Sequence, residues 1–176
     1  MSVSKFEDLV RDYAERQQRD ETAEPVRRQT RIKWWQDRVG ELVDDITQWL
    51  SPLVESGSLR IERSTAHLEE ESLGRYEISS VIVKLGSKQL MLKPLATVII
   101  GALGRIDVTG PNGKATLLLA SQGDSTASPE DRMANVKWFI SRPLLGGKPT
   151  RPQRRELRPL TQETFQDLFT DLFGIG

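Results

Sequence analysis

The sequence contains no cysteine and a single histidine, His67. The absence of cysteine excludes disulfide bonds and thiolate chemistry. A zinc site built around one histidine would need a carboxylate-rich ligand set, which is uncommon for this metal. We therefore expect no metal and no other cofactor, and the lack of cysteine suits a reducing compartment.

Long apolar runs are missing as well. The longest, residues 95–103, spans nine positions and includes Thr97 and Gly101, whereas a membrane-spanning helix needs about twenty apolar residues. The first ten residues mix charged and apolar side chains, which is unlike a secretory signal peptide. We therefore expect a soluble, cytoplasmic protein that does not enter a membrane.

An excess of one charge sign is the third absence. The 25 basic residues balance the 25 acidic ones, so the formal net charge is zero. A dedicated nucleic-acid domain would carry a strong basic excess. With 37% apolar and 28% charged residues, the composition predicts an ordered core with some solvated segments. The length of 176 residues predicts a single domain, 1–176.

Two amphipathic segments predict an N-terminal helical pair over residues 1–56. The first has apolar residues at helical spacing between Phe6 and Tyr13, and Pro25 is expected to end it. The second runs from about Thr30 to Ser51 and has a longer apolar stripe. The stripe consists of Ile32, Trp35, Val39, Leu42, Ile46 and Trp49. The first helix covers only part of this stripe, so the sheet or a second copy of the chain must cover the rest.

The hydrophobic period changes to two after residue 57. Alternation over residues 57–141, interrupted by turn signals such as Gly86-Ser87 and residues 110–113, predicts a mainly antiparallel β-meander of about five or six strands. Residues 122–132 are rich in Ser, Asp, Thr and Gly and predict a loop. Residues 142–160, rich in Pro, Gly and Arg, predict an extended, irregular basic loop.

The C-terminal residues 161–173 predict an amphipathic helix that packs on the sheet. Thr161 is the expected N-cap, and Gly174 follows the last apolar residue. The expected apolar face consists of Phe165, Leu168, Phe169, Leu172 and Phe173. The fold class is therefore α+β, with the helical pair first, the meander next and this helix last.

No catalytic constellation stands out in the sequence. His67 precedes a cluster of glutamates, Glu69 to Glu71, and is interpreted as a surface histidine. Residues 113–116 read Gly-Lys-Ala-Thr, but they lack the earlier glycine and the Ser or Thr after lysine that a phosphate loop requires. No G-x-S-x-G motif is present. These features argue against an enzyme without excluding one.

The basic loop is the strongest charged feature. Its cations face only Glu156 between residues 142 and 158; they are Arg142, Lys148, Arg151, Arg154, Arg155 and Arg158. Arginine binds phosphate oxygens in pairs, so the loop suits a nucleic-acid backbone. It equally suits an acidic face of a protein partner, or a solvated loop, and it has no interleaved aromatics for base stacking.

Four other residues are candidates for binding. Trp34 lies on the second helix but roughly 115° from the centre of its stripe, at about 100° per residue; it either packs under the first helix or anchors a partner. Lys93, Arg105 and Asp107 flank glycine-interrupted strands. If those strands bend around a pocket, the three side chains suit a small anionic ligand or an active site; otherwise they form an ordinary ion pair on a strand.

Three functional hypotheses follow. The first is a non-catalytic protein-interaction module that acts through a protein partner or through self-association as a homo-oligomer, with Trp34, Arg151, Arg154, Arg155 and Arg158 as its binding residues. The second is a nucleic-acid-backbone binder that uses residues 142–158. The third is a small-ligand binder or an enzyme at Lys93, Arg105 and Asp107.

Overall fold

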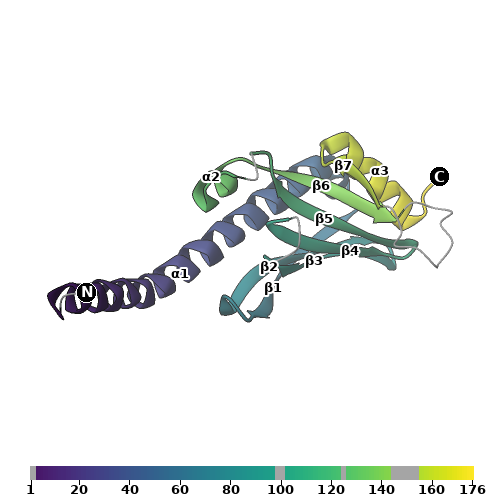
Figure 1. Ribbon diagram of the computed structural model, residues 1–176. Coiled ribbons are helices and arrows are strands. Elements are labelled where there is room, and N and C mark those ends of the chain that lie inside the picture. The colour runs from purple at the N-terminus through teal and green to yellow at the C-terminus, as the bar shows by residue number, and fades with distance from the viewer. Residues whose placement is uncertain (1–2, 98–101, 124–125, 144–154) are drawn as a thin grey trace, which may run out of the picture.

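The computed structural model describes residues 3–97, 102–123, 126–143 and 155–176 of the chain. Seven strands, in chain order, form one sheet in which each strand is antiparallel to the next (Figure 1). They are β1 (Arg60–Glu70), β2 (Gly74–Leu85), β3 (Lys88–Ala96), β4 (Gly104–Gly110), β5 (Gly113–Ser121), β6 (Val136–Pro143) and β7 (Arg155–Pro159). The predicted α+β class and antiparallel meander are confirmed, but the sheet has seven strands rather than five or six.

Tight turns fix the register of the meander. Leu85 pairs with Lys88 across the two-residue turn that begins at Gly86, which has a positive φ of 59°. Glycine adopts this left-handed conformation at no steric cost, so the predicted turn residue is the one required. Gly110 pairs with Gly113 across the second predicted turn.

The long helix α1 (Val3–Glu55) contains both predicted N-terminal helical segments. Pro25 lies inside it, so the prediction that Pro25 ends the first segment is wrong. Proline has no N–H, so the carbonyl one turn before it has no backbone donor. The neighbours of Pro25 are exposed, so water can donate a hydrogen bond to this carbonyl instead. Figure 1 shows α1 bend in its N-terminal half, as an interior proline commonly causes. Despite the length of α1, no helix in the described ranges is apolar enough to cross a membrane.

The second half of α1 covers one face of the sheet together with α3 (Gln162–Phe173). Trp49 of α1 contacts Phe165 of α3, with ring centroids 5.6 Å apart. Every residue of the predicted α1 stripe is buried except the half-buried Trp49, and the whole predicted face of α3 is buried. The apolar residues of both helices and the sheet form one cluster. The sheet and α3 therefore cover the stripe, and no second copy of the chain is needed for it.

Both predicted ends of α3 are confirmed. The Thr161 hydroxyl accepts a hydrogen bond from the Thr164 amide, and the Thr164 hydroxyl accepts one from the Thr161 amide. This is a capping box with threonine in place of the usual Glu or Gln. Gly174 follows the helix in the left-handed conformation, with φ of 70°, as is common after a C-terminal turn.

Two segments differ from the sequence prediction. Part of the predicted loop 122–132 is helical, because α2 (Pro129–Ala134) begins there. Within the predicted basic loop 142–160, residues 155–159 form strand β7 on the edge of the sheet. A strand is held by its backbone hydrogen bonds, so an edge strand does not need the apolar alternation used to recognise the inner strands.

Candidate functional site

A groove of ≈ 790 Å³ lies between α1 and α2. We call it the α1/α2 groove. The wall from α1 consists of Val26, Arg27, Thr30, Arg31, Trp34 and Arg38, and the wall from α2 and its cap consists of Pro129, Glu130, Met133 and Ala134. Apolar surface, three arginines and one glutamate therefore meet in a single concave site.

Trp34 connects the two walls of the groove. Its indole Nε1 donates a hydrogen bond to the carbonyl oxygen of Met133, at 3.1 Å. The guanidinium carbon of Arg31 lies 4.5 Å from the centre of the indole ring, which is within the range of a cation–π contact. Trp34 is half-buried, so it packs against α2 rather than under the first segment of α1, and one part of it still lines the groove.

The short helix α2 is positioned by its own cap. The Ser128 hydroxyl accepts a hydrogen bond from the Asp131 amide, at 3.2 Å, and Pro129 occupies the first turn. A serine cap followed by proline and acidic residues is a helix-start signal. Loop composition concealed this signal in the sequence, and the groove that α2 creates was therefore not predicted.

Arg31 extends from the groove to the chain segments that follow β3 and precede β4. Its Nη2 atom donates to the carbonyl oxygens of Thr97, at 3.1 Å, and Leu103, at 2.9 Å. Burial lowers the pKa of this guanidinium, although the negative charge of Glu70 acts in the opposite direction. Arg31 therefore fixes α1, and with it the groove wall, to the chain on both sides of residues 98–101.

A polar cluster beside Arg31 completes this attachment. The Glu70 carboxylate accepts hydrogen bonds from the Tyr76 hydroxyl, the Thr97 amide and the Thr97 hydroxyl. Burial, and then the hydrogen bond to Glu70, raise the pKa of the Tyr76 phenol. Glu70 and Tyr76 are brought together by the β1–β2 hairpin. Sequence reasoning missed this cluster because it gives no indication that Thr97 lies beside that hairpin.

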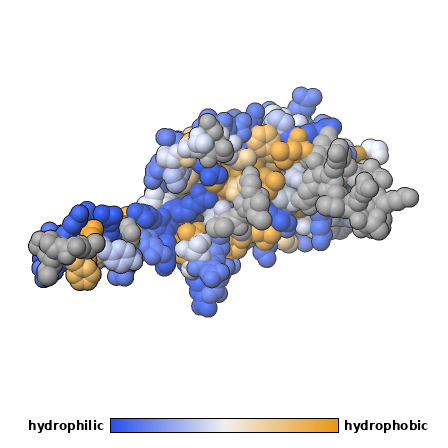
Figure 2. All heavy atoms as spheres, viewed as in Figure 1, coloured by the Kyte–Doolittle hydropathy of each residue, from blue (hydrophilic) through white to orange (hydrophobic). Residues whose placement is uncertain are grey.

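A second apolar surface lies on the exposed part of α1, residues 3–25, which we call the arm. Phe6, Leu9, Val10 and Tyr13 are between 52% and 65% exposed. Figure 1 shows the arm project beyond the sheet, and Figure 2 shows hydrophobic atoms at its outer end among hydrophilic ones. The predicted helical spacing is therefore confirmed, but within the described residues the apolar face has no cover.

The structure brings Lys93, Arg105 and Asp107 together on the sheet face opposite α1. Arg105 Nε lies 2.8 Å from the Asp107 carboxylate, and Lys93 pairs with Asp107 across β3 and β4. Both members of the Arg105–Asp107 pair are part-exposed. This geometry is the ion pair on a strand that we gave as the alternative, and a ligand for it stays a prediction.

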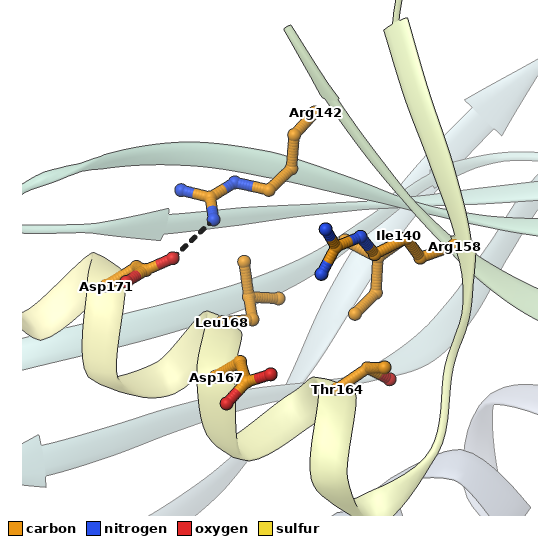
Figure 3. Close-up of a pocket in the computed structure, with 7 residues that line it drawn as sticks. All are labelled: Ile140, Arg142, Arg158, Thr164, Asp167, Leu168 and Asp171. Carbon is orange, nitrogen blue, oxygen red and sulfur yellow. Dashed lines mark hydrogen bonds and ion pairs between the residues drawn. The ribbon is translucent and has the colours of Figure 1, made fainter. Parts of the chain in front are cut away.

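The candidate arginines of the basic loop are described only in part. Arg151 and Arg154 lie outside the described residues, and of Arg155 only the backbone, in β7, is described. Arg158 lines a smaller pocket of ≈ 240 Å³ beside α3 (Figure 3). Arg142 Nη1 makes an ion pair there with Asp171, at 2.7 Å.

This smaller pocket has balanced charges. Its two arginines face two aspartates, Asp167 and Asp171 (Figure 3). Such a pocket has no net attraction for phosphate. Nucleic-acid binding by residues 142–158 therefore stays a prediction that the described part of the loop does not support.

His67 has the surface position expected of it. The side chain is exposed, and its Nδ1 atom lies 3.6 Å from the Glu77 carboxylate. In the part of the chain that the structure describes, no three His, Asp or Glu side chains are grouped so that they could hold a metal ion.

No known family model matches the chain, and no curated protein or solved structure is significantly similar to it. The function of the protein is therefore inferred from the site itself.

Proposed function

We propose that the protein is a non-catalytic interaction module that binds a protein partner in the α1/α2 groove. The observation that carries this proposal is Trp34, which is held in place from both sides and still lines an open groove. Tryptophan, arginine and methionine are enriched at interfaces, and tryptophan is often the residue that contributes most to binding. A side chain that is already ordered loses little conformational entropy when a partner binds.

The composition of the groove favours a helix or strand with both apolar and acidic side chains. Val26, Met133 and the indole of Trp34 offer apolar contact, whereas Arg27, Arg31 and Arg38 place positive charge on the α1 wall. Glu130 is the acidic residue of the lining. A partner with an apolar stripe beside carboxylates would satisfy both parts of this surface.

Val26→Asp tests the groove without disturbing the core, because Val26 is 66% exposed. Val54→Asp is the matched control: it makes the same change on the same helix, at a site that is 38% exposed and outside the groove. Tagged protein is used to capture partners from the lysate of its source cells. We expect Val26→Asp to reduce the captured partner at least about tenfold, since a desolvated carboxylate is costly, and Val54→Asp to capture it normally.

Nuclease treatment of the same lysate separates this proposal from the nucleic-acid hypothesis. Capture that survives nuclease and depends on Val26 supports a protein partner. Capture that is lost with nuclease, or that falls steeply with salt, would instead favour residues 142–158 as a nucleic-acid site. Equal capture by both valine variants would refute the groove as the binding site.

A further inference from the structure

We propose that the partner in the α1/α2 groove is a second copy of this chain, and that the two α1 helices pair antiparallel about a two-fold axis near residue 20. Each arm then lies along the groove wall of the other copy. This inference rests on the proposed function, since it names the occupant of the groove. It is carried by the exposed arm, by the spacing of its aromatic residues and by the distribution of charge along α1.

The arm needs a contact that the described chain does not supply. Its helix of residues 3–25 is about 34 Å long at 1.5 Å per residue, and its apolar residues Phe6, Leu9, Val10 and Tyr13 are exposed. A helix without tertiary packing is marginal in water. A partner that covers this apolar face would stabilise the arm in its helical form.

The spacing of the residues selects a particular register. Phe6, Tyr13, Arg27 and Trp34 are separated by multiples of seven residues, so they share one face of a helix that winds with a heptad period. Phe6 and Trp34 lie equally far from residue 20 on either side, and so do Tyr13 and Arg27. In an antiparallel pair, Phe6 of one copy therefore meets Trp34 of the other, and Tyr13 meets Arg27.

These two contacts are chemically favourable. Phe6 would enter the apolar part of the groove, where Trp34 and Met133 lie, and aromatic pairs add stabilisation beyond the area that they bury. Tyr13 would lie against the guanidinium of Arg27, a cation–π arrangement. The two-fold axis doubles each contact and closes the assembly as a dimer.

Charge along α1 is segregated in the way that antiparallel pairing requires. Residues 3–15, which face residues 25–37 in this register, carry two basic and four acidic side chains, a net of −2, whereas residues 25–37 carry four basic and one acidic side chain, a net of +3. Antiparallel pairing places each acidic part against a basic part. A parallel pair would oppose like charges, which is destabilising.

The shape of the chain permits this pairing. The arm projects beyond the sheet (Figure 1), so the two sheets would lie at opposite ends of the paired helices. The exposed ion pairs within α1, such as Arg11–Asp8 and Arg28–Glu24, do not oppose it strongly. Exposed pairs of this kind contribute little to stability, and their members can bind across the interface instead.

The test uses two charge-reversed variants of the full-length chain. The first, Asp8→Lys/Asp12→Lys, changes the net charge of residues 3–15 from −2 to +2, and the second, Arg27→Glu/Arg28→Glu, changes that of residues 25–37 from +3 to −1. The mass in solution is measured by sedimentation over a range of concentrations at low salt. The control, Glu55→Lys/Glu71→Lys, changes charge as the first variant does but at exposed sites outside the paired segment.

We expect the wild type and the control to dimerise, and each charge-reversed variant alone to dimerise at least about tenfold more weakly, because like charges then face each other. An equimolar mixture of the two variants should restore the dimer, since both copies again present opposite charges. Weakening of each variant alone, followed by restoration in the mixture, indicates that the acidic part of one copy meets the basic part of the other, and restoration is not explained by unfolding of either variant.

Three results would overturn the pairing. They are a wild type that stays monomeric at every concentration, variants that each dimerise like the wild type, and a mixture that fails to restore the dimer. A monomeric wild type that still captures a different protein through Val26 would refute the pairing alone. A monomeric wild type whose groove captures nothing would refute the proposed function as well.

Discussion

Gly104 at the start of β4 is required by its contact with Trp35. A Cβ atom at this position would lie within 3 Å of three atoms of the Trp35 ring. Trp35 is fully buried and contacts Trp138, with ring centroids 6.0 Å apart, so its ring has no room to move aside. The missing side chain of Gly104 thus lets α1 approach the sheet closely.

Gly104→Ala is therefore expected to destabilise the protein by about 1–3 kcal/mol, the usual cost of overpacking. Gly40→Ala is the control, because a Cβ at Gly40, inside α1, would have no atom within 4 Å. This second change should stabilise by about 0.5–1 kcal/mol, since glycine is a poor helix former. Urea unfolding measures both changes, and a neutral Gly104→Ala would contradict the close packing of Gly104 against the Trp35 ring.

Tyr76 gives the stability a dependence on alkaline pH. Burial and the hydrogen bond to Glu70 raise the pKa of its phenol above the ordinary value of 10.0. The folded state therefore keeps the proton at a pH where the unfolded state has lost it. The stabilisation by Tyr76 is fully present below pH 10 and is lost as the pH rises above it.

We expect Tyr76→Phe to be less stable than the wild type by about 1–2 kcal/mol at pH 8, since a hydrogen bond to a carboxylate is lost. The difference should shrink between pH 10 and pH 11, as measured by thermal unfolding. A wild-type advantage that stays constant up to pH 11 would mean that Tyr76 does not titrate as proposed.

At the scale of elements, the helices and inner strands were predictable because their patterns are local. The α1 stripe and the capping residue Thr161 specify burial and a helix end within a few residues of sequence. The turn at Gly86 could be recognised because few residues adopt its backbone conformation. Edge strand β7 escaped prediction because backbone pairing with β6, rather than side-chain pattern, defines it.

Pro25 shows where a local rule fails. A proline normally ends a helix because it removes one hydrogen bond and crowds the preceding turn. Here the helix continues through it, in a segment whose side chains are exposed. The continuity matters for the proposed pairing, because it joins the arm to the groove wall in one element.

The candidate site was predictable only in part for a related reason. Trp34 could be recognised as unusual because it lies off the α1 stripe, yet nothing local shows that Met133, 99 residues away, accepts its hydrogen bond. The groove depends on α2 and on the attachment of Arg31 to Thr97 and Leu103. Contacts between distant parts of the chain create this site, and a single sequence does not reveal them.

At the scale of the whole molecule, folding and the proposed association use different parts of α1. Residues 32–50 contribute to the core, whereas the described side chains of the arm are exposed, apart from the half-buried Ala23. The attachment through Arg31 also lies beyond the arm. The body that begins after residue 24 thus holds all the buried apolar contacts among the described residues.

Removal of residues 1–24 should consequently abolish dimerisation and leave the stability of the folded monomer unchanged. We expect the shortened chain and the wild type to have the same free energy of unfolding, within about 0.5 kcal/mol, at dilutions where both are monomeric. The reason is that an exposed helical arm adds little stability by itself. The melting temperature of the wild type should rise with protein concentration, as mass action requires of a dimer that binds only in the folded state. That of the shortened chain should not change. A shortened chain that is several kcal/mol less stable at high dilution would instead show that the arm packs on its own body.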